Sequence, residues 1–292
     1  MQLHAREMRA TLVCRQGASR QWMQRQSQDP FVAKARQDGY VARSAYKLTH
    51  IDDRFHLFDR QHTRIAIDLG CSPGGWCQVI RERAGDRCFL LGIDLLPIKA
   101  QIPNAVIVQG DFTDVTTQEK LVKCLAHHSA TLGRGDATTA VASPSSSCFT
   151  KVDVVTSDMC PNRMGGSQDR QRIAQLNLQA INVCAPLLRI GGHFVCKVLG
   201  SRAAYEELWC RLSRLFLTVH ACKPPASRMH SDEAFLVALD KLATPRPASS
   251  ATRSCSSRAI MGTASGDSSG GGRFGLDDWP GFGRPERRQR RG

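Results

Sequence analysis

Two lysines and two carboxylates of this sequence occur where a chemical site could form. Lys197 lies within the apolar run FVCKV, and Asp158 directly follows the apolar run VDVVTS. Burial in such a strand disfavours the charged form of a lysine, so we predict a lowered pKa for Lys197. Lys47 lies in the helical stretch VARSAYKL, and Glu233 begins the last predicted strand. The aliphatic part of an isolated lysine at a strand end often lies on apolar surface while its ammonium group reaches solvent. A chemical site is therefore predicted only if these four residues lie close together in the fold.

A second group of residues predicts a site for an adenosine-containing cofactor. The first strand runs into DLGCSPGGW, Asp68 to Trp76, whose glycines let the backbone approach a ligand. The spacing is not G-x-G-x-x-G, and Pro73 removes one N–H donor, which suits a nucleoside without a pyrophosphate. Asp94 ends the second strand, where an acid can accept hydrogen bonds from ribose hydroxyls. Asp111 ends the third strand and either contacts an adenine or caps a turn; at this point both nicotinamide cofactors and S-adenosylmethionine stay open.

Alternating strands and helices would bring these residues to one edge of a sheet. Helical spacing from Ile173 to Leu188 is predicted to end at Gly191 and Gly192, and another helix is predicted at Tyr205–Phe216. The pattern predicts an α/β, doubly wound fold with a mostly parallel sheet and helices on both faces. Ligands of such sheets bind beyond the carboxyl ends of the strands. The predicted strands are Ile65–Leu69, Phe89–Asp94, Ala105–Gln109, Val152–Ser157, His193–Val198 and Ala234–Leu239.

Composition favours a nucleic-acid partner and excludes a disulfide-stapled or membrane-spanning chain. The 292 residues carry a net charge of +14, and arginines and lysines that neutralise phosphates release counterions. The sequence has no C-x-x-C pair to suggest zinc, and no run approaches the ~18 apolar residues that cross a bilayer. We therefore predict no metal and reduced, buried thiols. The cysteines that lie in apolar or glycine-rich runs are Cys71, Cys77, Cys184 and Cys196.

One domain is predicted at residues 19–241, and three segments, one of them an insertion within it, are predicted to lie outside its packed core. Residues 1–18 form a basic lead, since residues 1–25 hold five arginines and one acid, Glu7. Such a composition is typical of a mitochondrial transit peptide, but the arginines could equally form an RNA-binding arm. Residues 127–150, rich in Ser, Thr, Ala and Gly, are predicted to be a surface insertion. Residues 242–292 are predicted to be a disordered basic tail.

The motifs together resemble one known family, the FtsJ/RrmJ-type RNA ribose 2′-O-methyltransferases. The resemblance extends from about Ser19 to Ala238, and only the insertion and the tails show none. It implies a Rossmann-like methyltransferase fold and S-adenosylmethionine as the cofactor. The glycine loop departs from the family at Cys71 and Ser72, where small residues such as alanine are usual. In chain order the motifs are SRQWMQRQSQDPF, ARSAYKL, DLGCSPGGW, GIDLLP, QGDF, TSDMCPN, FVCKV, KPPASR and SDEAFLVA.

The resemblance also implies roles for individual residues. The catalytic tetrad would be Lys47, Asp158, Lys197 and Glu233, with Lys197 as the proton acceptor. Its pKa would be depressed by the neighbouring charge of Lys47, Asp158 would orient it, and Glu233 would hold Lys47 or the ribose. The implied cofactor contacts are Gly74, Trp76, Asp94, Asp111 and Asp158. The basic residues expected to bind RNA are Arg20, Arg25, Lys34, Arg36 and Arg43.

The lead-in SRQWMQRQSQDPF and the motif SDMCPN resemble the branch of the family that methylates a uridine of large-subunit rRNA. The expected partner is rRNA or a precursor of the large ribosomal subunit, and the chain is expected to be a monomer. The expected location is the mitochondrial matrix, with the cytoplasm or nucleolus as alternatives. A tRNA 2′-O-methyltransferase and a noncatalytic ribosome assembly factor stay open as other functions.

Overall fold

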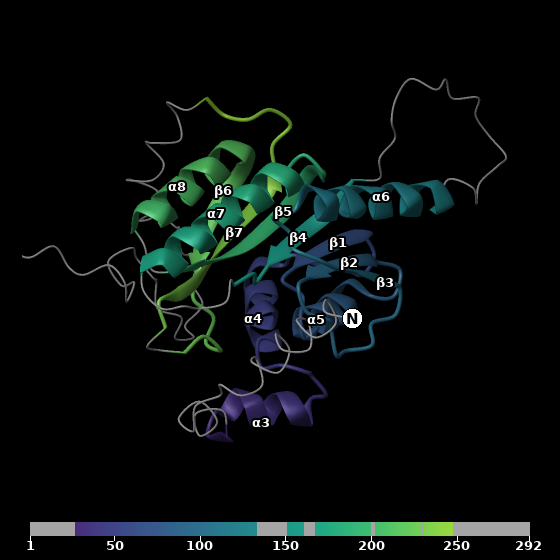
Figure 1. The fold of residues 1–292 in the computed structure, drawn as a ribbon, viewed down its shortest axis with the longest axis vertical. Coiled ribbons are helices and arrows are strands. Elements are labelled where there is room, and N and C mark those ends of the chain that lie inside the picture. Colours follow the sequence, from purple (N-terminus) through teal and green to yellow (C-terminus); the bar gives the residue numbers. More distant parts are fainter. Residues whose placement is uncertain (1–26, 133–150, 161–166, 200–201, 229–230, 248–292) are drawn as a thin grey trace, which may run out of the picture.

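A seven-stranded sheet forms the centre of the computed structural model, which describes residues 27–132, 151–160, 167–199, 202–228 and 231–247 (Figure 1). The strand order is β3-β2-β1-β4-β5-β7-β6. Strands β1 to β5 pair in parallel, while β7 is antiparallel to both β5 and β6. The predicted α/β fold with a mostly parallel sheet is thereby confirmed. The strands are β1 (Ile65–Leu69), β2 (Phe89–Asp94), β3 (Ala105–Gln109), β4 (Val152–Ser157), β5 (Leu188–Leu199), β6 (Phe216–Cys222) and β7 (Glu233–Lys241).

Helices cover both faces of the sheet. Side chains of α4 and α5 form one apolar core with the sheet, and side chains of α6, α7 and α8 form the other. Figure 1 shows the two layers on opposite sides, with α3 beyond α4. α3 packs on α4 through Ala35 and Tyr46, whose hydroxyl donates to Asp38. The helices are α3 (Pro30–Gln37), α4 (Ala45–Phe55), α5 (Gly75–Ala84), α6 (Val115–Leu132), α7 (Ser167–Cys184) and α8 (Arg202–Leu215).

Burial explains why the central strands could be predicted from the sequence. Every residue of β1 and β4 is buried, as expected for parallel strands covered on both faces. The order of the strands reverses between β1 and β4, so the segments that follow these two strands flank the crevice where such sheets bind ligands. Within the described ranges, every helix is too short or too polar to cross a bilayer.

The two helices predicted after β4 are present, but the predicted end of each was wrong. Helix α7 ends at Cys184, so Gly191 and Gly192 do not cap it but lie inside β5. Gly191 adopts φ 74°, and the pairing of β4 with β5 shifts register between Val152 and Val154, so the glycines form an irregularity of the strand. Phe216, predicted as the end of a helix, begins the unpredicted strand β6.

Two predicted segment boundaries also need correction. The insertion was expected from residue 127, but α6 continues to Leu132, with the ring of His128 stacked on that of Phe89 at 3.9 Å. The tail was expected from residue 242, yet Leu242 N–H donates to Leu215 O, and the Arg246 guanidinium donates to the Ser213 and Leu217 carbonyls. Most of the predicted lead, insertion and tail lies outside the described residues.

Candidate active site

A buried ion pair joins the first turn of α4 to the start of β7. Lys47 Nζ lies 2.7 Å from Glu233 Oε1 and 2.8 Å from Glu233 Oε2. The two side chains are 13% and 9% exposed, so each charge depends on the other for compensation. Ser227 Oγ donates to Glu233 Oε1 at 2.9 Å and fixes the carboxylate from a second side. The expected contact between Glu233 and Lys47 is therefore present.

A second ion pair joins β5 to the residue that follows β4. Lys197 Nζ lies 2.8 Å from Asp158 Oδ1 and also donates to the Asp158 carbonyl. The Lys197 side chain is 5% exposed, and Asn177 Nδ2 donates to the Lys197 carbonyl at 2.6 Å, which ties its backbone to α7. Asp158 is therefore in direct contact with Lys197, which is the contact that its expected orienting role requires.

The predicted lowering of the Lys197 pKa is wrong. Burial lowers the pKa of Lys197, but the neighbouring charge of Asp158 and its hydrogen bond outweigh burial, and the pKa is raised above that of a free lysine. Lys47 is paired with Glu233 and is not among the main causes of this pKa shift. The resting site therefore holds Lys197 as an ammonium ion.

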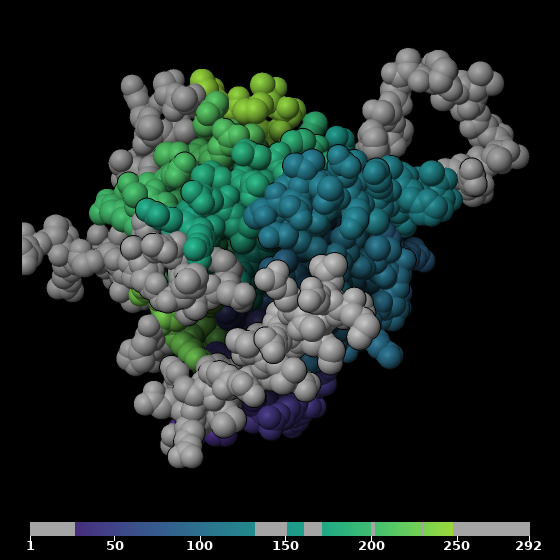
Figure 2. All heavy atoms as spheres, in the orientation of Figure 1, coloured from purple at the N-terminus to yellow at the C-terminus, as the bar shows by residue number. Residues whose placement is uncertain are grey.

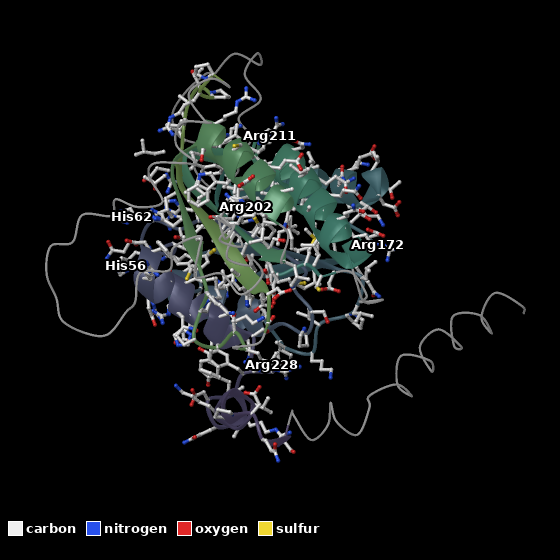
Figure 3. All side chains as sticks on the ribbon, turned by 90° about the vertical axis from the view of Figure 1, so that its left-hand side faces the viewer. His56, His62, Arg172, Arg202, Arg211 and Arg228 are labelled. Carbon is white, nitrogen blue, oxygen red and sulfur yellow. The ribbon has the colours of Figure 1, made fainter. Side chains whose placement is uncertain are left out.

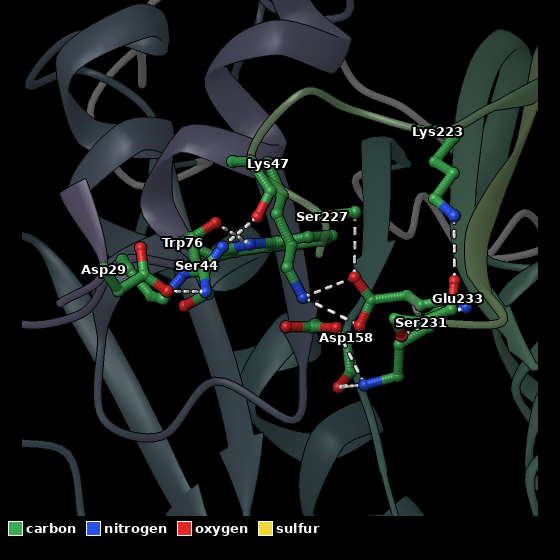
Figure 4. Close-up of polar contacts among 12 residues, drawn as sticks. Asp29, Ser44, Lys47, Trp76, Asp158, Lys223, Ser227, Ser231 and Glu233 are labelled. Atoms are coloured by element: carbon green, nitrogen blue, oxygen red, sulfur yellow. Dashed lines mark hydrogen bonds and ion pairs between the residues drawn. The ribbon is translucent and has the colours of Figure 1, made fainter. Parts of the chain in front are cut away.

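The two ion pairs lie next to each other. Leu199 of β5 is the register partner of Glu233 of β7, two residues from Lys197. The charge of Glu233 contributes to the raised pKa of Lys197, and Figure 4 shows Asp158 beside Lys47 and Glu233. All four residues of the predicted tetrad are thus brought together.

The glycine loop after β1 is held by the carboxylate that ends β2. Asp94 Oδ2 accepts from Ser72 N–H and Asp94 Oδ1 from Leu96 N–H, each at 2.8 Å. Gly74, at the start of α5, adopts φ 113°, and a Cβ there would lie 2.7 Å from the Ala100 Cβ. Only glycine fits this turn, which brings the loop, Asp94 and the start of α5 to the crevice between β1 and β4.

Two predicted cofactor contacts have other partners. The Trp76 side chain is 3% exposed, packs on the Phe235 ring and donates from Nε1 to Ser44 O, so only its main chain, in the first turn of α5, can face a ligand. Asp111 Oδ1 accepts from the N–H and the hydroxyl of Thr113, which is the turn-forming role that stayed open for it.

The predicted RNA-binding residues divide into three groups. Lys34 and Arg36 are exposed on α3, on the same side of the sheet as Lys47. Arg43 is half-buried, forms an ion pair with Asp29 and donates to the Ala226 carbonyl, so it also ties the segment before α4 to the segment before β7. Arg20 and Arg25 lie outside the described residues.

Three residues that contact the predicted site were not singled out in the sequence. Ser227 and Arg228 belong to the motif KPPASR, which was noted without a role for either side chain. Asp29 caps α3 by accepting from Phe31 N–H and pairs with Arg43 and, at 3.8 Å, with Arg228. In the sequence, only their membership of a motif could have pointed to them. Their contacts could not be predicted, because these contacts depend on how distant segments of the chain meet.

Comparison with known proteins agrees with this geometry. The family model of FtsJ-like methyltransferases matches residues 40–241. The chain belongs to the FtsJ-like methyltransferase family. A ribosomal RNA large subunit methyltransferase E from Zymomonas mobilis is 40% identical over 225 residues, covering 77% of this chain and 89% of the relative. The protein of the same name from Caulobacter vibrioides is 39% identical over 219 residues, covering 74% and 84%. A solved Plasmodium falciparum structure, named as a ribosomal RNA methyltransferase, is 27% identical with a TM-score of 0.52, and the match covers 71% of this chain and all of that one.

The FtsJ-like family confirms methyl transfer as the activity and S-adenosylmethionine as the cofactor, which removes the nicotinamide alternative. The residues present fit this cofactor. Each Asp94 oxygen accepts one backbone N–H and keeps a further lone pair for a ribose hydroxyl. Leu95 and Leu96, which follow it, are each 56% exposed and offer apolar surface for a purine. The side chains of Asp94 and Asp158 and the main chain around Gly74 would hold the cofactor.

Proposed function

We propose that this FtsJ-like enzyme methylates a ribose 2′-hydroxyl, that of a uridine, in large-subunit rRNA. The observation that carries the proposal is the meeting of Lys47, Asp158, Lys197 and Glu233 at the carboxyl edge of the sheet, beside the cofactor loop. The names of the bacterial relatives support rRNA as the substrate. The basic composition supports a polyanionic partner.

The chemistry required is the activation of an alcohol. S-adenosylmethionine, when bound, supplies a methyl group that is already electrophilic because it is attached to a sulfonium. Lys197 Nζ takes the proton of the ribose 2′-hydroxyl, a contribution of roughly 10²–10⁴ in rate. Asp158 holds Lys197 in place but also stabilises its ammonium form, so Lys197 must lose a proton before it can act as a base. The rate should therefore rise with pH through the neutral range.

The remaining residues position the acceptor. Lys47, held by Glu233 and Ser227, lies in the first turn of α4 and can donate to ribose oxygens. Lys34 and Arg36 on the exposed face of α3 provide phosphate contacts, together with Arg43. Phosphate contacts set the register of the strand, and an unstacked nucleotide then reaches the site.

The test is transfer of labelled methyl from S-adenosylmethionine to large-subunit rRNA and to tRNA, with Lys197→Ala as the control. We expect labelled 2′-O-methyluridine in the rRNA and none with the variant. Label in tRNA alone would overturn the choice of substrate. Binding of the cofactor without label in either RNA, or in intact large-subunit particles, would favour a noncatalytic assembly factor.

A role in large-subunit assembly and a mitochondrial location are the finer parts of the proposal. Their support is the family of rRNA-modifying relatives and the arginine-rich composition of residues 1–25. A fluorescent fusion to the full chain should reach mitochondria, and a fusion that lacks residues 1–18 should not. A cytoplasmic or nucleolar signal from the full chain would overturn this location.

A further inference from the structure

A pocket of about 200 Å³ opens beside the Lys47–Glu233 pair. Its lining comes from the segment that leads into α4 and from the segment that leads into β7. Figure 4 shows part of this wall, with Ser44, Lys47, Ser231 and Glu233. The polar and charged side chains in the lining are Arg43, Ser44, Lys47, Arg228, Ser231 and Glu233.

Positive charge exceeds negative charge around the pocket. Lys47 and Glu233 neutralise each other at 2.7 Å. Arg43 and Arg228 share a single carboxylate, that of Asp29, which is only 10% exposed and stands behind them. One cation is left in excess. An anion of the substrate is the natural complement of such a pocket.

Several donors in the pocket have capacity for a ligand. Arg43 donates from Nη1 to Asp29 and from Nη2 to the Ala226 carbonyl, and each of these nitrogens carries a second N–H. Arg228 is 39% exposed and approaches Asp29 only to 3.8 Å, so most of its donors are available. Ser44, the residue before α4, makes no capping hydrogen bond with its side chain, and the positive end of the α4 dipole lies here.

We propose that this pocket binds the 3′-phosphate of the nucleotide whose 2′-hydroxyl is methylated, with Arg228 and Arg43 as the phosphate ligands. The assignment rests on the proposed function. The 3′-phosphate is attached to the carbon next to the one that carries the 2′-hydroxyl, so a site for it must adjoin the site of reaction. The pocket meets this condition because Lys47 and Glu233 belong both to its wall and to the tetrad. A planar guanidinium suits the paired oxygens of a phosphodiester.

The contact between Asp29 and the two arginines gives this site its preorganisation. Asp29 N-caps α3, the helix that also presents Lys34 and Arg36. The Arg43 guanidinium simultaneously donates to the Ala226 carbonyl, next to Ser227. One network therefore links the α3 surface, the phosphate pocket and the carboxylate of Glu233. An RNA strand bound along α3 would thus continue into the phosphate pocket and reach the tetrad.

The variant Arg228→Ala tests the site, and Arg211→Ala is its matched control. Arg211 is an exposed arginine whose side chain donates, among the described residues, to Asn182 Oδ1, and Figure 3 shows it in the upper part of the view, well separated from Arg228. Binding of a fluorescent oligo(U) of about ten nucleotides to the full chain is measured against salt concentration. For Arg228→Ala we expect about tenfold weaker binding and a salt slope reduced by roughly 0.7, the value for one lost phosphate contact on a single strand. Arg211→Ala should match the wild type.

Competition against the same oligo(U) distinguishes a 3′-phosphate from any free anion. Uridine 3′-monophosphate should compete several-fold better than uridine 5′-monophosphate or inorganic phosphate, and Arg228→Ala should abolish this preference. Equal competition by all three, or equal effects of Arg228→Ala and Arg211→Ala, would overturn the proposal. These are binding measurements, so they stand whether or not methyl transfer to rRNA is found. Where transfer is found, Arg228→Ala should raise KM for RNA by more than it lowers kcat.

Discussion

The two halves of the site are held together in different ways. In the cofactor half, comprising the glycine loop and Asp94, a carboxylate accepts backbone N–H groups from Ser72 and Leu96, 22 and 2 positions away. In the acceptor half, comprising the Lys47–Glu233 pair and the phosphate pocket, charged side chains meet across 186 positions. One half is built from local backbone, the other from distant side chains.

This difference predicts how each half responds to substitution. A backbone-built loop tolerates changes of side chain, and Cys71 and Ser72 are such changes from the small residues usual in the family. A buried ion pair does not, because removal of one partner leaves an uncompensated charge behind. Variants of the acceptor half should therefore affect turnover, and variants of the cofactor half should affect cofactor affinity.

The largest effect is expected for Lys197→Ala. Loss of the base should lower kcat by roughly 10²–10⁴, while the Kd for S-adenosylmethionine stays within about threefold of the wild type. Turnover is measured with labelled methyl, and cofactor binding by calorimetry. Lys241→Ala is the matched control, since this lysine ends β7 and its side chain donates, within the described part of the chain, to the Leu188 carbonyl. A Lys197→Ala enzyme that turns over at the wild-type rate would remove Lys197 from the base role.

Asp94→Ala should produce the converse result. The variant loses the acceptor for Ser72 N–H and Leu96 N–H together with the proposed ribose contact. Cofactor affinity should fall about 10- to 100-fold, as expected for hydrogen bonds to a charged group, with kcat at saturating cofactor little changed. Asp86→Ala, an exposed acid of the α5–β2 turn, serves as the control. Unchanged affinity by calorimetry would exclude Asp94 from the ribose role.

The same contrast explains how much of the fold could be predicted from the sequence. The predicted ranges of β1 to β4 coincide with the observed ones. Three of these strands are apolar runs bounded by turns. The fourth, Ala105–Gln109, is bounded by a turn before it and by Gly110 after it. Strand β6 was missed because it follows α8 without a break and lies at the sheet edge, where five of its residues in a row are exposed or half-buried. Sequence periodicity carries little information there.

The residues of the site could be predicted from the sequence, but the contacts between them could not. The motifs located all four members of the tetrad, yet the lowered pKa predicted for Lys197 was wrong. The apolar run FVCKV indicates burial, which lowers the pKa, but it does not reveal Asp158 at 2.8 Å, which raises it. Asp29 and Ser227 were missed for the same reason, since their partners lie on other segments.

Asp158→Asn sharpens the comparison through the pH dependence of turnover. The charge of Asp158 is the main cause of the raised Lys197 pKa, and burial opposes it. Removing that charge lowers the pKa, so neutral Lys197 should become populated at lower pH. At saturating cofactor, the rising limb of kcat against pH should move to lower pH. Glu233→Gln should move it in the same direction by less, because Glu233 contributes less to the Lys197 pKa. A limb that stays in place or moves to higher pH would contradict the assignment.

The smallest effect is expected for Asp68, which lies in β1 just before the glycine loop of the cofactor half. This carboxyl is fully buried at the end of β1, accepts from Thr156 Oγ1 at 2.8 Å and lies 3.3 Å from the Cys77 sulfur. Burial raises the pKa of Asp68 to about 7. A raised carboxyl pKa means that the folded state holds its proton more tightly than the unfolded state. The resulting stabilisation is complete below the unfolded pKa of about 4 and is lost as pH rises through about 7.

Asp68→Asn should remove this part of the pH dependence, because an amide oxygen accepts from Thr156 Oγ1 without ionising. Denaturant unfolding at pH 5 and pH 8 measures it. The wild type should lose on the order of a few kcal/mol between the two values beyond any loss in the variant, and the variant should be the more stable of the two at pH 8. Parallel losses in both proteins would show that Asp68 is ionised at neutral pH, and that the base of the cofactor half contains a buried charge like those of the acceptor half.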